Sequence, residues 1–127
     1  MAARSQRLGK LMVLQGKLKA LHETRQAGHM AASIRAREEA EDLRRRADTA
    51  DSFASIFPDL YSRHISDALA RAAGEDRKAA EEAKLVATAT LRMKRVGEAF
   101  RAARADEERQ REERERLELV QRQAAEK

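Results

Sequence analysis

The sequence contains no cysteine and no tryptophan, and it has one proline, one tyrosine and three phenylalanines among 127 residues. Without cysteine there are no disulfides and no thiolate metal sites, which fits a reducing compartment such as the cytoplasm. Few aromatic residues, with 26 alanines among the apolar ones, exclude a thick hydrophobic core. No apolar run approaches the roughly 20 residues that a membrane span needs. The charged N-terminal stretch does not fit a secretory signal, so we expect a cytoplasmic protein.

The chain is rich in charge, at 39% of its residues, and in strong helix formers. Ala, Glu, Arg, Lys, Leu and Gln dominate it, which predicts a thin, helical protein. The formal net charge of +5 resides in residues 1–25, which hold six basic residues and one acidic residue. Such a basic stripe can meet phosphates or an acidic protein surface. Because no aromatic residues are interleaved for base stacking, we expect no nucleic acid partner.

The single proline, Pro58, lies near the midpoint and predicts a break between two helices. It ends the first helix at or before Phe57, or it begins the second helix as a first-turn residue. The predicted fold is therefore all-α, a long antiparallel two-helix coiled-coil hairpin. As a single structural unit it would have helix 1 at about 4–50, an apex at about 48–58 and helix 2 at about 59–122.

Apolar periodicity predicts the seam along which the two helices meet. In the first half it runs through Leu11, Leu14, Leu18, Leu21, Gly28 and Ala32, with Arg25 as an exception, and continues through Ala36 and Ala40 as a stutter before Leu43. In the second half it runs through Ile65, Leu69, Ala72, Ala79, Ala83 and Val86, interrupted by Asp76, and slips in phase near residue 90 before Met93, Val96, Phe100 and Ala103.

Folding back at the apex brings together residues whose numbers sum to about 114. This register pairs Leu14 with Phe100 and Gly16 with Gly97. Facing glycines would let the helix axes approach closely, whereas two unrelated glycines would each merely cost about 1 kcal/mol relative to alanine. Both interpretations stay open at the level of sequence. The register leaves the tail beyond about residue 110 without a partner.

The tail begins with "DEERQREERERLE", residues 106–118, in which 11 of 13 residues are charged. Alternating Glu and Arg residues stabilise a solvated helix, which is the simpler interpretation. Leu117 near the end of this segment, together with Leu119 and Val120 just after it, suggests a short apolar patch for docking.

No stretch of the chain carries a convincing catalytic motif. "GKLMVLQGKL" resembles a phosphate loop but has six residues between the glycines instead of four, and Leu18 stands where Ser or Thr would hold magnesium. "HETRQ" has Gln26 where a zinc protease has its second histidine. We expect His22, His29 and His64 to face solvent. The prediction is a non-enzyme with no catalytic residue, cofactor or metal.

Three stretches together, "RLGKLMVLQGKLKALHETRQA", "SFASIFPDLYSRHI" and "RVGEAFRAARADEERQREERERLE", resemble the flagellar export protein FliJ and its injectisome counterparts of the YscO type. The resemblance implies the non-enzymatic central stalk of a type III export ATPase. The family stalk is similar to the rotary-ATPase gamma subunit, and its helix termini enter the pore of the hexameric ring. It promotes ring assembly and ATP hydrolysis, links the ring to the membrane export gate and helps to recycle export chaperones. A monomer in the cytoplasm, peripheral at the inner face of the cell membrane, is implied.

The resemblance also implies site residues. The ATPase-binding residues would be Arg4, Arg7, Lys10, Arg104, Arg109 and Arg111. The export-gate-binding residues would be Tyr61, His64 and Ala68, of which only Tyr61 is a strong match, because larger aromatic or aliphatic residues are expected at the other two. Leu117, Leu119 and Val120 would serve tail docking.

Two alternatives come from other classes of protein. The first is a generic dimeric coiled-coil scaffold that shares its apolar stripe between chains, with Pro58 as a kink. The second is a basic-ended nucleic-acid-binding helical protein, whose affinity would fall steeply with salt. The sequence does not choose between a flagellum and an injectisome.

Overall fold

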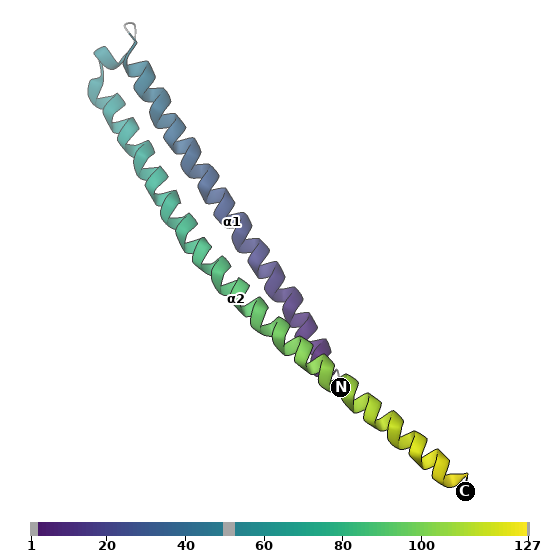
Figure 1. Ribbon diagram of the computed structural model, residues 1–127. Helices are drawn as coiled ribbons and strands as arrows, with labels where there is room; N and C mark the ends of the chain where they lie inside the picture. Colours follow the sequence, from purple (N-terminus) through teal and green to yellow (C-terminus); the bar gives the residue numbers. More distant parts are fainter. Residues whose placement is uncertain (1–2, 50–52, 127) are drawn as a thin grey trace. The chain divides into compact units, whose positions relative to one another are not determined.

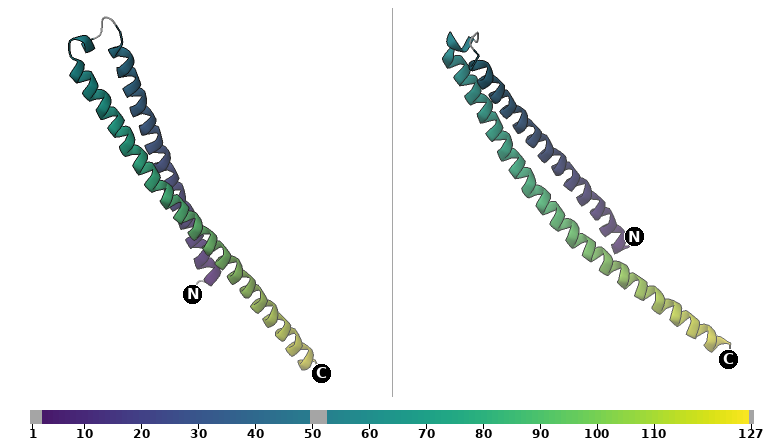
Figure 2. Two further views of the ribbon diagram at one scale, coloured as in Figure 1. Left: turned by 60° about the vertical axis from the view of Figure 1, so that its left-hand side comes forward. Right: turned by 45° about the horizontal axis from the view of Figure 1, so that its top comes forward.

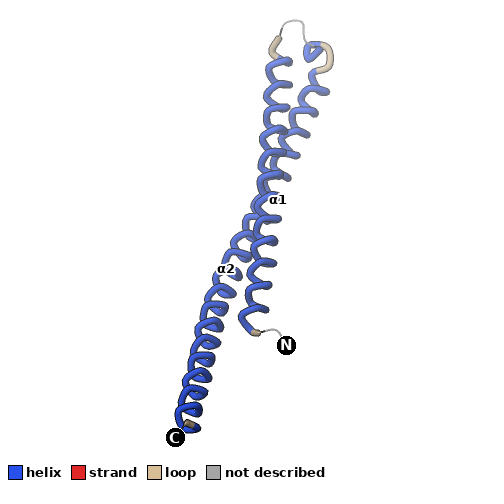
Figure 3. Tube along the Cα trace, turned by 90° about the vertical axis from the view of Figure 1, so that its right-hand side faces the viewer, coloured by secondary structure: helices blue, strands red, loops and turns tan. Residues whose placement is uncertain are grey.

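The computed structural model describes residues 3–49 and 53–126, and these residues are almost entirely helical. The elements are α1 (Arg4–Ala47), a short 3-10 helix η1 (Phe53–Ser55) and α2 (Pro58–Ala125). Figure 3 shows helices and loops and no strand in this described part of the chain. The two long helices pack against each other, which confirms the all-α helical hairpin.

Helix α1 begins where the carbonyl of Ala3 accepts hydrogen bonds from the backbone N–H groups of Gln6 and Arg7, at 3.0 and 3.2 Å. It ends at Ala47, with three arginines (residues 44–46) in its last turn. Their positive charge is favourable at the negative end of the helix dipole. The predicted apex at about 48–58 includes residues 50–52, which lie outside the described residues.

Pro58 is the first residue of α2. The carbonyl of Phe57 accepts hydrogen bonds from the N–H groups of Leu60 and Tyr61, at 3.2 and 3.4 Å. Proline suits the first position of a helix because its missing N–H would have no partner there and its φ angle is already helical. Asp59 adds a negative charge in the first turn. The sequence allowed Pro58 either to end the first helix or to begin the second, and in the structure it begins the second.

The chain divides into two compact units. The first unit consists of Met1–Leu18 and Ala89–Lys127, and the second of Lys19–Thr88. In each unit a stretch of α1 lies alongside an antiparallel stretch of α2 (Figures 1 and 2).

Helix α2 carries an uninterrupted heptad seam of buried and half-buried residues. The seam alternates steps of three and four through Ile65, Ala68, Ala72, Glu75, Ala79, Glu82, Val86, Ala89, Met93, Val96, Phe100 and Ala103. Most of the predicted seam positions are therefore confirmed, but the predicted phase slip near residue 90 is wrong, and Leu69 is exposed. The predicted seam was built from apolar residues alone. It missed two seam positions because glutamates, Glu75 and Glu82, occupy them.

The first part of the α1 seam is displaced by one residue along the chain from the predicted seam, whereas the predicted positions from Ala36 to Ala47 are confirmed. Its buried and half-buried positions are Ser5, Leu8, Met12, Gln15, Lys19, His22, Gln26, His29, Ser33, Ala36, Ala40, Leu43 and Ala47, again in steps of three and four. Leu11, Leu14 and Leu21 are instead 38%, 52% and 43% exposed. The predicted leucine seam and the predicted stutter are wrong, because small and polar residues occupy the interface and several of them have partners on α2.

Glycines in the first unit receive long side chains from the opposite helix. A Cβ atom at Gly16 would lie 3.8 Å from Met93 Cε, one at Gly97 would lie 3.9 Å from Met12 Cε, and one at Gly9 would lie 3.4 Å from Phe100 Cε2. The residue numbers in each pair sum to 109 rather than 114. The predicted Gly16–Gly97 pair is therefore wrong, and so is the register that paired Leu14 with Phe100, because Met93 and Met12 lie against these two glycines and Phe100 lies against Gly9.

Candidate functional site: protein-interaction surfaces

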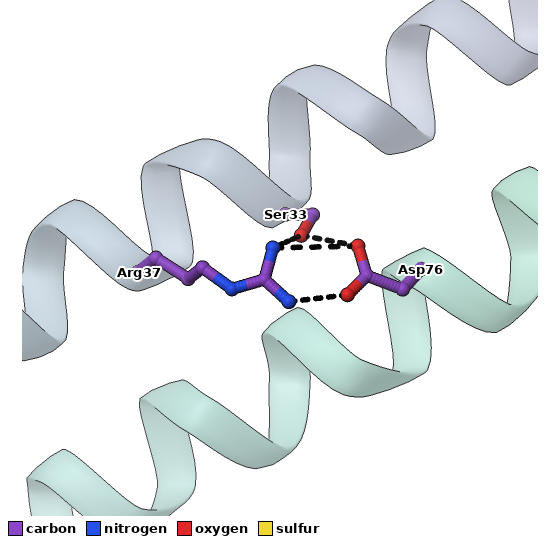
Figure 4. Close-up of polar contacts among 3 residues, drawn as sticks. All are labelled: Ser33, Arg37 and Asp76. Carbon is purple, nitrogen blue, oxygen red and sulfur yellow. Dashed lines mark hydrogen bonds and ion pairs between the residues drawn. The ribbon is translucent and has the colours of Figure 1, made fainter.

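The second unit joins its helices through a polar cluster of Ser33, Arg37 and Asp76 (Figure 4). The Ser33 hydroxyl donates a hydrogen bond to Asp76 Oδ1 at 2.5 Å and accepts one from Arg37 Nη1 at 2.6 Å. Arg37 Nη2 also pairs with Asp76 Oδ2. Ser33 is 1% exposed, so these bonds satisfy a hydroxyl that water does not reach. The hydrogen bonds from Arg37 and then Ser33 lower the pKa of Asp76.

Two histidine–glutamate pairs join the same two helices. His22 Nδ1 lies 2.7 Å from Glu82 Oε2, and His29 Nδ1 lies 2.6 Å from Glu75 Oε2. Both histidines are half-buried, so the prediction that they face solvent is wrong; His64 is exposed as predicted. The hydrogen bond with His29 is the main cause that lowers the pKa of Glu75. A sequence signal existed, since the two histidines are seven residues apart and so are the two glutamates.

These polar side chains join α1 to α2 in the second unit. Arg71 Nη2 bonds Glu39 Oε2 at 2.8 Å and adds another contact between α1 and α2. Within the described ranges, no group of three or more His, Asp or Glu side chains could hold a metal ion. In the first unit Gln15 Oε1 is buried and has no hydrogen-bond partner, which is unfavourable for folding.

The start of α1 is fastened to α2 in the first unit. The Ser5 N–H donates to Glu107 Oε1 at 3.1 Å, and the Ser5 hydroxyl donates to Glu107 Oε2 at 2.6 Å. These two bonds, the hydroxyl bond first, lower the pKa of Glu107. Arg104 and Arg111 line a shallow groove beside this contact. The structure thus brings the α1 and α2 members of the predicted ATPase-binding set to the same part of the first unit.

All six predicted ATPase-binding residues are exposed, but they differ in their partners. Arg109 pairs with Asp106, and Arg111 pairs with Glu108, each on its own helix. Arg104 lies 5.8 Å from the centre of the Phe100 ring.

The three α1 members of the set, Arg4, Arg7 and Lys10, have no ion-pair partner within the part of the chain that is described. Residues 3–18 hold four basic residues and no acidic one. The uncompensated positive charge of this surface therefore belongs mainly to α1.

The predicted export-gate residues do not share one exposed face. His64 is exposed and Tyr61 is half-buried. Ala68 is 0% exposed, because it is a seam residue of α2 packed against α1. Ala68 therefore cannot touch a partner while the helices are paired, and the prediction for this residue is corrected.

The C-terminal part of α2 extends past the start of α1 in the first unit (Figure 1, yellow). Every described side chain from Glu108 to Glu126 is exposed. Leu117, Leu119 and Val120 are 61%, 55% and 55% exposed. Leu117 and Val120 are three residues apart and share a face, whereas Leu119 is rotated about 200° from Leu117. The three predicted tail-docking residues are exposed but do not form a single patch.

None of the described helices combines the length and the apolar character that crossing a membrane requires.

Comparisons of the chain with protein-family models, with curated proteins and with solved structures found no match.

Proposed function

We propose that this chain is a non-enzymatic stalk component of the flagellar type III protein export apparatus. In this role it binds the hexameric export ATPase, promotes ring assembly and ATP hydrolysis, and links the ring to the cytoplasmic domain of the export gate. The proposal rests on the resemblance to the FliJ and YscO-type stalks. Such a stalk works as a monomer in the cytoplasm, held at the inner face of the membrane through its partners alone, and contacts export chaperones.

One observation carries the proposal beyond the resemblance. The antiparallel pair in the first unit presents Arg4, Arg7 and Lys10 without compensating carboxylates, beside the exposed Arg104 of α2. A surface with an excess of positive charge at the end of a helix pair is what an acidic lining of a ring pore would bind. Tyr61 and His64 remain the export-gate residues of the proposal, without Ala68.

The scaffold alternative needs the apolar seam to be shared between chains. In the structure the seam residues of α1 and α2 pack against each other within one chain. This favours the stalk over a dimer that uses the same seam.

The test is stimulation of ATP hydrolysis by the export ATPase of the same cells. A variant with Arg4→Glu, Arg7→Glu and Lys10→Glu should keep its helical circular dichroism and lose most of the stimulation that the unchanged chain gives. The charge-matched control is Arg92→Glu, Lys94→Glu and Arg95→Glu, at exposed positions of α2 in the same unit. The control makes the same change in net charge. It should stimulate ATP hydrolysis normally, because its three residues lie outside the predicted ATPase-binding set.

Equal stimulation by both variants would remove the α1 surface from the contact. No stimulation by the unchanged chain, together with failure of the tagged chain to co-purify with the ATPase after nuclease treatment, would overturn the stalk proposal. Co-purification that vanishes with nuclease would instead support the nucleic-acid alternative.

A further inference from the structure

Three leucines of α1 form a second apolar stripe that the helix pair covers only in part. Leu11, Leu14 and Leu18 have the three-and-four spacing of a coiled-coil seam, and all lie in the first unit. Leu11 and Leu14 are 38% and 52% exposed, and Leu18 is half-buried. The stripe is displaced by one residue from the seam residues Met12 and Gln15, hence by about 100° around the helix.

The charges that α1 places beside this leucine stripe all have the same sign. Arg7 lies seven residues before Leu14 on the same face, and Lys10 and Lys17 lie along one edge. All three are exposed. The first acidic residue of the chain is Glu23, so no carboxylate within residues 4–22 neutralises this face.

We infer that the leucine stripe binds an amphipathic α-helix of another protein, one that has leucine-like residues at heptad spacing flanked by acidic residues. The heptad spacing selects a helix, because the side chains of a second helix fit between leucines placed in this way. The basic edge selects acidic flanks, because Arg7, Lys10 and Lys17 would otherwise be left against like or uncharged groups. In the complex the first unit would become a three-helix contact.

Two other occupants fit the charges less well. A second copy packed through the same stripe would bring one basic edge against another, with no carboxylate on either face to offset the repulsion. A membrane surface would suit the positive charge, but the stripe is narrow, since the face of α1 about 100° away packs on α2, and it has no aromatic residue to anchor it at the headgroups. The acidic helix therefore matches both the apolar and the charged features.

The inference does not depend on the export role, because it predicts a helix-binding surface whatever the source of the helix. The probe is a synthetic peptide of three heptads, with Leu at the core positions and Glu at the flanking positions, labelled for fluorescence anisotropy with the full-length chain. The control peptide has Lys in place of every Glu. We expect saturable binding of the acidic peptide and at least tenfold weaker binding of the basic one.

The key variant is Leu14→Gln, since Gln preserves helix propensity and the side chain is already half exposed. It should weaken binding of the acidic peptide by about tenfold, the loss expected for one leucine side chain removed from a contact. The matched control is Leu91→Gln, at a leucine of α2 in the same unit that is 48% exposed, and it should leave binding unchanged. Lys10→Gln with Lys17→Gln should weaken binding and reduce its dependence on salt.

Equal binding by the Leu14→Gln variant, or equal binding of both peptides, would overturn the inference. So would binding to anionic phosphatidylglycerol vesicles that requires Leu14 when the acidic peptide does not bind, since the occupant would then be a membrane. A dimer in sedimentation equilibrium that Leu14→Gln converts to a monomer would assign the stripe to a second copy instead. Because none of these measurements uses the ATPase, failure here is separate from failure of the proposed function.

Discussion

The two units build the same helix pairing from different chemistry. In the first unit most of the contacts are matters of shape, since glycines on one helix receive Met or Phe side chains from the other, and the hydrogen bonds of Ser5 to Glu107 join the helices at the start of α1. In the second unit alanines bring the helices together, and Ser33, His22 and His29 bond carboxylates across the interface. Apolar contacts tolerate small shifts, whereas hydrogen bonds tolerate only one alignment of donors and acceptors. The register of the two helices is therefore specified most strongly in the second unit.

The largest effect is expected from a larger side chain in the alanine seam of the second unit. Ala72 is 1% exposed, so Ala72→Leu forces a larger side chain between packed helices and should destabilise the fold by about 3 kcal/mol. Ala70→Leu, at an exposed neighbouring position, is the control and should cost little. Urea denaturation followed by circular dichroism measures both. If the two variants were equally stable, the alanines would not set the distance between the helices.

Removing the carboxylate of the polar cluster should have the next largest effect. Asp76→Ala takes the acceptor from the buried Ser33 hydroxyl and the partner from Arg37, so we expect a loss of stability in urea denaturation that is smaller than the loss from Ala72→Leu. The double variant Ser33→Ala with Asp76→Ala should lose less than the sum of the two single changes, because it leaves no buried hydroxyl unpaired. Additive losses in this double-mutant cycle would show that the two groups are not coupled.

Replacing a glycine of the first unit should have a smaller effect, and it should stabilise the fold rather than destabilise it. At Gly16 a Cβ atom would make an ordinary contact with the flexible end of Met93. Gly16→Ala should therefore stabilise the chain by about 1 kcal/mol through helix propensity. Gly28, which has nothing within 4 Å of its Cβ position, is the control and should gain the same amount. A loss at Gly16 with a gain at Gly28 would mean that close approach of the helix axes requires this glycine.

Acid should weaken the second unit through the carboxylates of Glu75 and Asp76, and this is the smallest of the expected effects. The pKa values of Glu75 and Asp76 are lowered in the folded chain, so the unfolded chain binds more protons at acidic pH. Their contribution to stability is complete above the unfolded pKa of about 4 and is lost as the pH falls through the lowered values. Thermal melts between pH 7 and pH 2 should show that Glu75→Gln loses less stability on acidification than the unchanged chain. An identical decline in both would contradict the role of Glu75.

Much of the fold could be predicted from local chemistry. The helix formers predict α1 and α2, and Pro58 predicts the single break between them, because a proline is compatible with a helix only in its first turn. The seam of α2 was largely predictable, since Ile65, Ala72 and Val86 are small or apolar residues at heptad positions.

The candidate surfaces were predictable to different degrees. The basic residues at the start of α1 were predictable, because charge is read directly from the sequence and all are exposed. The burial of Ala68 was not, since an alanine fits a seam as well as a surface. The pairing of His29 with Glu75 joins residues 46 positions apart, so neither residue alone indicates it.

Two long helices, one reversal of the chain and a positive N-terminal surface could all be predicted from the sequence. Helix propensity, the geometry of proline and the charge of side chains each depend on only a few neighbouring residues. Only the tertiary structure decided which face of α1 packs. Two stripes with the same spacing run along this helix one residue apart, and the more apolar stripe is the one left outside. The inner stripe contains His22, His29 and Ser33, whose partners Glu82, Glu75 and Asp76 come from α2. A choice between faces that depends on distant partners is made only when the two helices meet.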